Sequence, residues 1–178
     1  MERKLFNKGS IIKYVLILTL FLSSQLEVKS QSINLENNKV QVVKDYLQAA
    51  FNKDYSRQKT FMHQDIVDYH PTVLSPPAKG KEELINGWKN TMQSMDSIIY
   101  IRKGIGIVSF MEGELLGEWV VESGLVKSKF QGVEQWVEFQ MTGLYKVESG
   151  LIKEVHNFGN TLDIYQQLGY SLEPPKKD

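Results

Sequence analysis

The fold is decided by residues 141–169, which read MTGLYKVESGLIKEVHNFGNTLDIYQQLG. Apolar side chains alternate along this stretch up to Val147, and the E-S-G that follows is typical of a tight turn. A second strand is expected over residues 151–158, followed by a short amphipathic helix that ends at Gly169. The stretch therefore predicts a β-hairpin that leads directly into a C-terminal helix.

The N-terminal half of the chain predicts mainly helices. Apolar residues recur at helical spacing over residues 39–52 and again over residues 81–95, and a brief helix is expected at 57–62. Between them, residues 65–70 read as a short strand that a proline ends. Residues 73–80, which contain two adjacent prolines, are expected to form a loop.

Residues 97–158 predict long antiparallel strands, with a bulge or bend at Gly104 and Gly106. In residues 114–122, strict alternation assigns to the core-facing side Leu115, Gly117, Trp119 and Val121. In residues 136–147, the same rule selects Val137, Phe139, Met141, Gly143, Tyr145 and Val147. Long strands with glycine breaks predict a strongly curved sheet that the helices must cover on one side. The expected fold class is therefore α+β, a helix-capped cone whose wide end is a natural pocket.

Residues 1–30 predict a secretory signal peptide. Four basic side chains precede the apolar run VLILTLFL at 15–22, and the compact residues Val28 and Ser30 favour cleavage before Gln31. The alternative is an uncleaved membrane anchor, but the apolar segment is shorter than the ~20 residues of a spanning helix. We therefore expect a secreted or periplasmic protein that keeps no membrane span after cleavage. A single domain is expected over residues 31–178, with its core at 39–170.

Composition excludes several classes of function. The chain has 178 residues and no cysteine, which rules out disulfides and thiol chemistry. Cleavage of the leader removes five of 21 basic and two of 21 acidic side chains, which leaves 16 against 19. This balance does not suit a nucleic-acid partner. The three histidines, His63, His70 and His156, lack metal-ligand spacing, and we expect neither a metal nor another cofactor.

Two segments carry a family resemblance. Their matching residues are Gly150, Ile152, Glu154 and the Q-L-G of 167–169, and upstream the D-I-V-D-Y-H-P of 65–71 with Gly80. They resemble the SnoaL-like polyketide cyclase family, within the nuclear transport factor 2-like superfamily, over residues 39–170. The resemblance implies the same fold, a helix-capped cone of curved antiparallel sheet.

The chain departs from that family at its functional positions. The position of the family's acid/base aspartate is Asn160 here, and an amide cannot take up a proton near neutral pH. The family's pocket histidine falls on Tyr69, and a family tryptophan falls on His156. His156 is a candidate base because imidazole titrates in the required range, with Tyr69 or Asn160 as hydrogen-bonding support. The alternative is that His156 is a hydrogen-bonded histidine near the sheet edge and that Tyr69 only packs its ring and satisfies its hydroxyl.

Large apolar side chains at inward positions suit a flat hydrophobic ligand, or they form plain core: Trp88, Trp119, Phe139, Met141 and Tyr145. Trp136 is expected on the opposite sheet face, where it favours a homodimer interface. Three hypotheses follow from the sequence. The protein binds or transforms a small hydrophobic molecule in the cone; it is an isomerase, cyclase or lyase that uses His156; or it is a non-enzymatic homodimerisation module.

Overall fold

The computed structural model describes residues 36–70 and 75–171. The chain divides into two units, residues 1–38 and 39–178, and the description below concerns the second. The expected signal peptide lies outside the described residues, so its secretory role stays a prediction. Within the described ranges, no helix is both long and apolar enough to cross a membrane.

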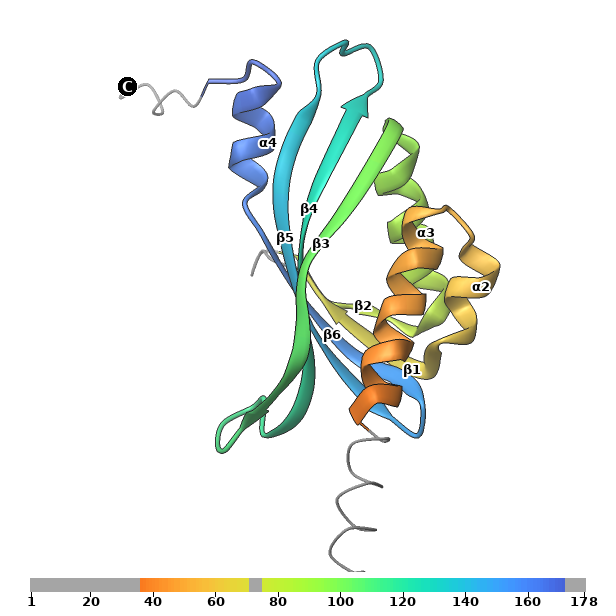
Figure 1. The fold of residues 1–178 in the computed structure, drawn as a ribbon. Coiled ribbons are helices and arrows are strands. Elements are labelled where there is room, and N and C mark those ends of the chain that lie inside the picture. The colour runs from red at the N-terminus through yellow and green to blue at the C-terminus, as the bar shows by residue number, and fades with distance from the viewer. Residues whose placement is uncertain (1–35, 71–74, 172–178) are drawn as a thin grey trace, which may run out of the picture. The chain divides into compact units, whose positions relative to one another are not determined.

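The elements follow the predicted order, with helices before the long strands (Figure 1). A first helix covers residues 36–51. After it come α2 (Tyr55–Thr60), β1 (Met62–Tyr69), β2 (Ala78–Lys79), α3 (Gly80–Gln93), β3 (Met95–Phe110), β4 (Gly117–Phe130), β5 (Val137–Glu148), β6 (Leu151–Gly159) and α4 (Thr161–Gln167). One sequence expectation needs correction, because residues 78–79, predicted as loop, pair with β1 as a short strand.

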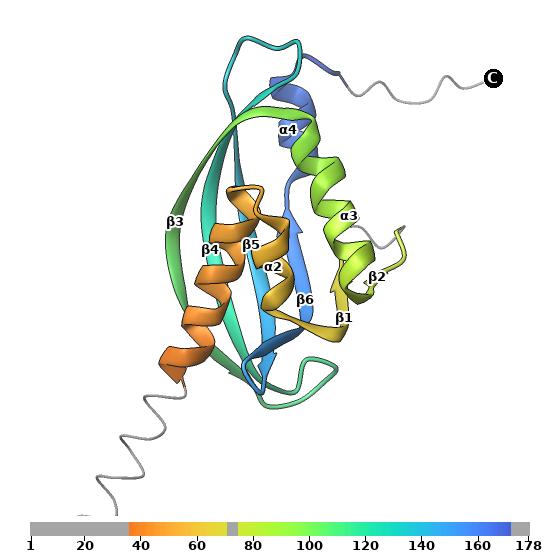
Figure 2. The ribbon, with the colours of Figure 1, turned by 90° about the vertical axis from the view of Figure 1, so that its right-hand side faces the viewer.

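The strands form one six-stranded sheet in the order β2-β1-β6-β5-β4-β3. Neighbouring strands are antiparallel with one exception, the parallel pair of β1 and β6. This pair places Asp68 beside Val155 and Tyr69 beside His156. The long strands bend along their length, and the first helix, α2 and α3 lie against one face of the sheet (Figures 1 and 2). The predicted helix-covered curved sheet is confirmed.

The core lies between these helices and the inner face of the sheet. Tyr46 and Leu47 of the first helix and Ile85 of α3 are buried against Tyr145 and Ile152 of the sheet. Their burial follows the apolar stripes that predicted the helices. At roughly 1.5–3 kcal/mol for each large side chain, such contacts provide most of the energy that holds the helices on the sheet.

The inward face of β4 was predicted wrongly. From Val120 onward the buried positions are the even-numbered ones, including Glu122 and Val126, whereas Val121 is half-buried on the other face. Trp119 is buried too, but against side chains of the outer face. Alternation failed here because adjacent apolar residues occur on both faces and because a glutamate occupies a core position. For β5 the assignment was correct, with Tyr145 and Val147 in the core.

The hairpin and terminal helix that the opening stretch predicts are both present. Ser149 and Gly150 turn the chain with positive φ angles of 50° and 79°. β6 ends beside Met141, so the beginning of β5 extends past it. There the Gln167 side chain takes the place of a strand: its Oε1 accepts from Glu138 N–H at 2.9 Å, and its Nε2 donates to the Glu138 carbonyl at 2.7 Å. The final glutamine of the Q-Q-L-G sequence thus fastens α4 to the edge of the sheet.

Candidate functional site

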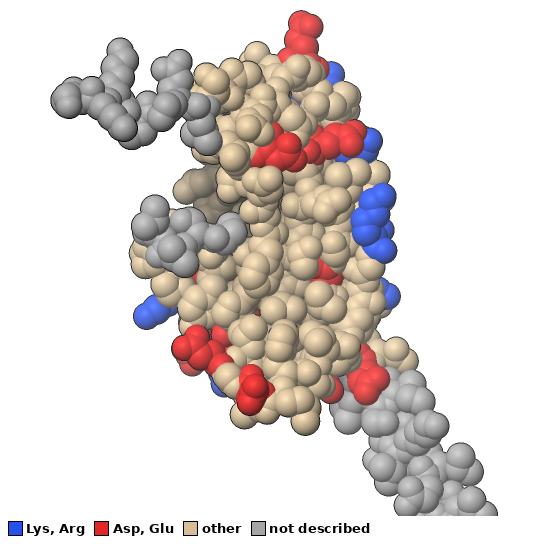
Figure 3. Space-filling view, turned by 90° about the vertical axis from the view of Figure 1, so that its left-hand side faces the viewer, with Lys and Arg blue, Asp and Glu red and all other residues tan. Residues whose placement is uncertain are grey.

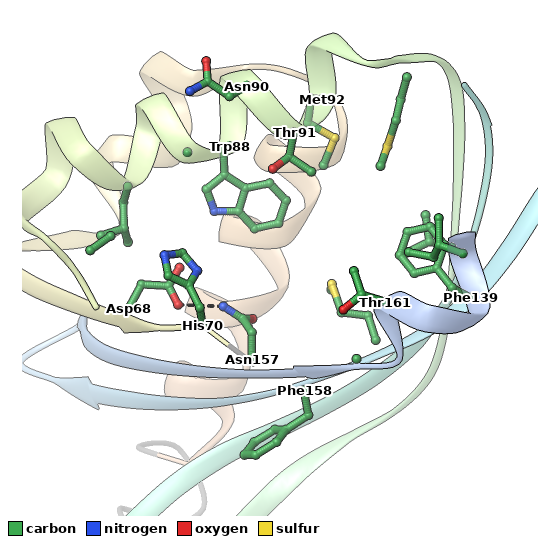
Figure 4. A pocket seen from close by; sticks show the side chains of 18 of the residues that line it. Asp68, His70, Trp88, Asn90, Thr91, Met92, Phe139, Asn157, Phe158 and Thr161 are labelled. Carbon is green, nitrogen blue, oxygen red and sulfur yellow. Dashed lines mark hydrogen bonds between the residues drawn. The ribbon is translucent and has the colours of Figure 1, made fainter. Parts of the chain in front are cut away.

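A cavity of about 590 Å³ lies between α3, the inner face of the sheet and α4. One part of its wall is apolar, with Phe51, Trp88, Met92, Val126, Phe139 and Met141. A polar group lies at the end where β1 and β6 run side by side, and it consists of Asp68, His70 and Asn157 (Figure 4). The cavity therefore combines apolar walls with a cluster of hydrogen-bonding side chains on β1 and β6.

Asp68 is the central polar residue of the cavity. The parallel pairing of β1 with β6 brings Asn157 next to it, and Asn157 Nδ2 donates to Asp68 Oδ1 at 2.7 Å (Figure 4). Only 6 % of the residue is exposed. Burial raises the pKa of the Asp68 carboxyl to about 7, and the hydrogen bond from Asn157 opposes part of that rise. This carboxyl can therefore take up and release a proton near neutral pH.

Two aromatic residues support this end of the cavity. Trp88 lines the cavity from α3, and its Nε1 donates to the Tyr46 hydroxyl at 3.1 Å. Burial, together with the negative charge of Asp68, raises the pKa of Tyr46 well above its ordinary value. Tyr46 consequently stays protonated and neutral, and the hydrogen bond fixes the orientation of the Trp88 ring.

Four of the residues predicted from sequence line the cavity: Trp88, Phe139, Met141 and Asn160. Asn160 also caps α4, since its Oδ1 accepts from Asp163 N–H at 3.3 Å. Tyr145 is not among the lining residues; its ring is buried 6.1 Å from that of Tyr46. The part that these residues play in ligand binding or catalysis stays a prediction.

The structure places Tyr69 and His156 together on the outer face of the sheet, where neither lines the cavity. Their rings stack with centroids 4.4 Å apart, and Trp119 meets the His156 ring edge-on at 5.3 Å. His156 Nε2 lies 2.7 Å from Glu154 Oε1. Most of the surface on this side is uncharged (Figure 3). Within the described residues, no group of histidine and acidic side chains could hold a metal ion.

Sequence reasoning missed both Asp68 and Asn157. A signal was present, because Asp68 follows the buried Ile66 at a spacing of two and Asn157 follows the buried Val155 in the same way. In a strand, such a spacing places the polar residue on the buried face. A polar residue that shares the buried face of a strand with core residues indicates either a buried hydrogen-bonded pair or a functional site.

A second buried carboxyl, Glu122 on β4, lies away from the cavity lining. It is fully buried, and Arg102 Nε lies 3.5 Å from its Oε1. Burial raises its pKa to about 7. The hydroxyl of Tyr145 lies over the neighbouring Gly143 and is also buried. It neither donates nor accepts a hydrogen bond among the described residues.

The fold is that of nuclear transport factor 2-like proteins, as the sequence resemblance implied. Solved structures similar to this chain include a protein from Jannaschia sp. CCS1 named for its likeness to SnoaL polyketide cyclases. Its TM-score is 0.62 at 14% identity, over 77% of this chain and 95% of that one. An NTF2-like protein from Burkholderia xenovorans LB400 has a TM-score of 0.54 at 17% identity, over 74% and 95%.

An LEH-like epoxide hydrolase from M. tuberculosis is also similar, with a TM-score of 0.57 at 17% identity over 75% of this chain and 90% of that one. Neither a protein-family model nor a curated protein matches the chain. At these identities the likeness establishes the fold and leaves the reaction to the site itself.

Proposed function

We propose that this protein binds a small hydrophobic molecule in the cavity between α3 and the sheet. The observation that carries the proposal is the cavity, whose volume of about 590 Å³ falls within the roughly 300–1,000 Å³ of small-molecule sites. Its wall is mostly apolar, and Asp68 is the buried member among the polar residues of the described lining. An apolar wall with a few placed polar groups is the usual composition of a site that binds and orients a small hydrophobic ligand.

Binding can be tested with N-phenyl-1-naphthylamine, a neutral probe whose fluorescence rises in apolar surroundings. We expect saturable binding to the wild-type protein. Met141→Trp should fill the cavity and abolish the signal, whereas Met111→Trp, at a position that is 86 % exposed and outside the cavity, should leave it unchanged. Binding that survives Met141→Trp would place the probe elsewhere and remove the support for this proposal.

A second candidate function is proton transfer on the bound molecule, as in an isomerase or lyase. It is favoured by Asp68, which reaches the cavity from β1 and whose pKa burial raises to about 7. Such a carboxylate can remove a proton from a carbon next to a carbonyl and return it at another atom, which leaves the protein unchanged. We assign the role of the base to Asp68 because His156 faces away from the cavity. Asp68→Asn should abolish turnover and retain binding of the neutral probe.

We also propose that the protein acts outside the cytoplasm, on the basis of the leader in residues 1–30. Expression of the full chain in a bacterial host with a secretory pathway should yield a mature form that begins at Gln31. N-terminal sequencing of the exported fraction measures this directly, and a chain that keeps its leader inside the cell would contradict it.

A further inference from the structure

The described lining of the cavity carries acidic side chains without lysine or arginine to balance them. Two acidic residues, Asp68 and Glu83, are among the described residues that line it, and none of those residues is a lysine or an arginine. A buried carboxylate is costly unless a positive group or several hydrogen bonds compensate its charge. Among the described residues, no basic side chain forms an ion pair with Asp68, whose hydrogen bond comes from the neutral Asn157.

The geometry around Asp68 leaves room for a positive partner. Asn157 bonds to Oδ1, and Oδ2 accepts no hydrogen bond from another described residue. The Trp88 ring extends from α3 toward the space above Asp68 and Asn157 (Figure 4). An aromatic face attracts a cation, and this attraction is stronger where water is excluded. A carboxylate and an indole thus border the same compartment.

We propose that the natural ligand is a hydrophobic amine, a molecule with an apolar body and one positively charged nitrogen that pairs with Asp68. This inference rests on the proposed function and narrows it to one class of ligand. The ammonium group supplies the charge that the lining lacks and donates hydrogen bonds to the carboxylate. The apolar body then lies along Met92, Phe139 and Met141. A ligand carboxylate would instead meet two like charges, which costs binding energy.

Three probes of matched shape test the charge preference: 1-naphthylmethylamine, 1-naphthalenemethanol and 1-naphthoate. Calorimetric titration at pH 8 keeps the amine protonated. We expect the amine to bind at least about tenfold more tightly than the alcohol, and the carboxylate to bind most weakly. Asp68→Asn should bring the affinities for amine and alcohol within about threefold of each other. Asp65→Asn, an exposed carboxylate on the same strand, should leave the preference unchanged.

A second measurement needs only the wild-type protein. Between pH 8 and pH 5 the affinity for the amine should fall, because Asp68 takes up a proton, while the affinity for the alcohol stays constant. His70 and Glu83 are the other titratable groups of the described lining, and Tyr46 behind Asp68 stays neutral. His70→Gln serves as the control for the histidine of the lining, and this variant should retain the pH dependence.

The outcomes separate this inference from the proposed function. The inference of an amine ligand is wrong if the alcohol binds as tightly as the amine, or if the preference for the amine is retained in Asp68→Asn. Either result leaves the proposed hydrophobic site in the cavity unaffected. If neither the three naphthalene probes nor N-phenyl-1-naphthylamine binds, the proposed hydrophobic site and the proposed amine ligand are both wrong. Preferential binding of the carboxylate would overturn the inference outright.

Discussion

Replacement of Glu122 by glutamine should change how the stability of this protein depends on pH. Burial raises the pKa of the Glu122 carboxyl from 4.5 to about 7 in the folded state. Between these values the folded protein binds more protons than the unfolded chain, so the free energy of unfolding falls as pH rises. A tenfold change in proton affinity is worth about 1.4 kcal/mol, so the loss between pH 4.5 and pH 8 is about 3 kcal/mol. The glutamine side chain cannot ionise, so the substitution should abolish this loss.

Urea denaturation followed by tryptophan fluorescence, at half-unit steps from pH 5 to pH 8 and constant ionic strength, measures the effect. Asp68 contributes a loss of the same sign, because burial raises its pKa from 3.8 to about 7. Glu122→Gln should therefore remove roughly half of the wild-type slope, and the double variant with Asp68→Asn nearly all of it. Glu114→Gln, an exposed carboxylate before the same strand, serves as the control. Parallel profiles for wild type and Glu122→Gln would refute the reasoning.

Further predictions concern packing, the terminal helix and the outer face. Gly143→Ala places a methyl group 2.5 Å from the Tyr145 hydroxyl and should lower the free energy of unfolding by about 2 kcal/mol in urea titrations; an unchanged midpoint would contradict the packing described. Gln167→Ala should speed hydrogen exchange of α4, since each lost hydrogen bond is worth about 1 kcal/mol, whereas the exposed neighbour Gln166→Ala should not. We expect the mostly uncharged outer face to form a homodimer that Ile101→Lys dissociates; a wild-type monomer in sedimentation velocity would rule this out.

The fold could be predicted from sequence because its signals are local and repeated. Helical spacing in the first helix and α3, the E-S-G turn and the alternation in β5 each indicate the element that the structure contains. The pairing of β1 with β6 was not predictable in this way. It joins two segments about 90 residues apart through a parallel contact, and alternation carries no information on the partner of a strand.

The site was predictable only in part. Trp88, Phe139 and Met141 were selected as large apolar residues on inward positions, and all three line the cavity, while their part in ligand binding stays a prediction. His156 was selected for its chemistry, yet the parity of β6 places it on the outer face and Asn157 on the inner one. Burial creates the reactivity of Asp68, and burial depends on the register of strands that lie far apart in sequence.

The most direct test of the central claim, that the cavity receives a small hydrophobic molecule, is a crystal structure of residues 31–178 grown with N-phenyl-1-naphthylamine. We predict electron density for the probe between the Trp88 ring and Met141, with its nitrogen toward Asp68. Density for the probe on the outer face alone, with protein side chains filling the space between α3 and the sheet, would contradict the claim.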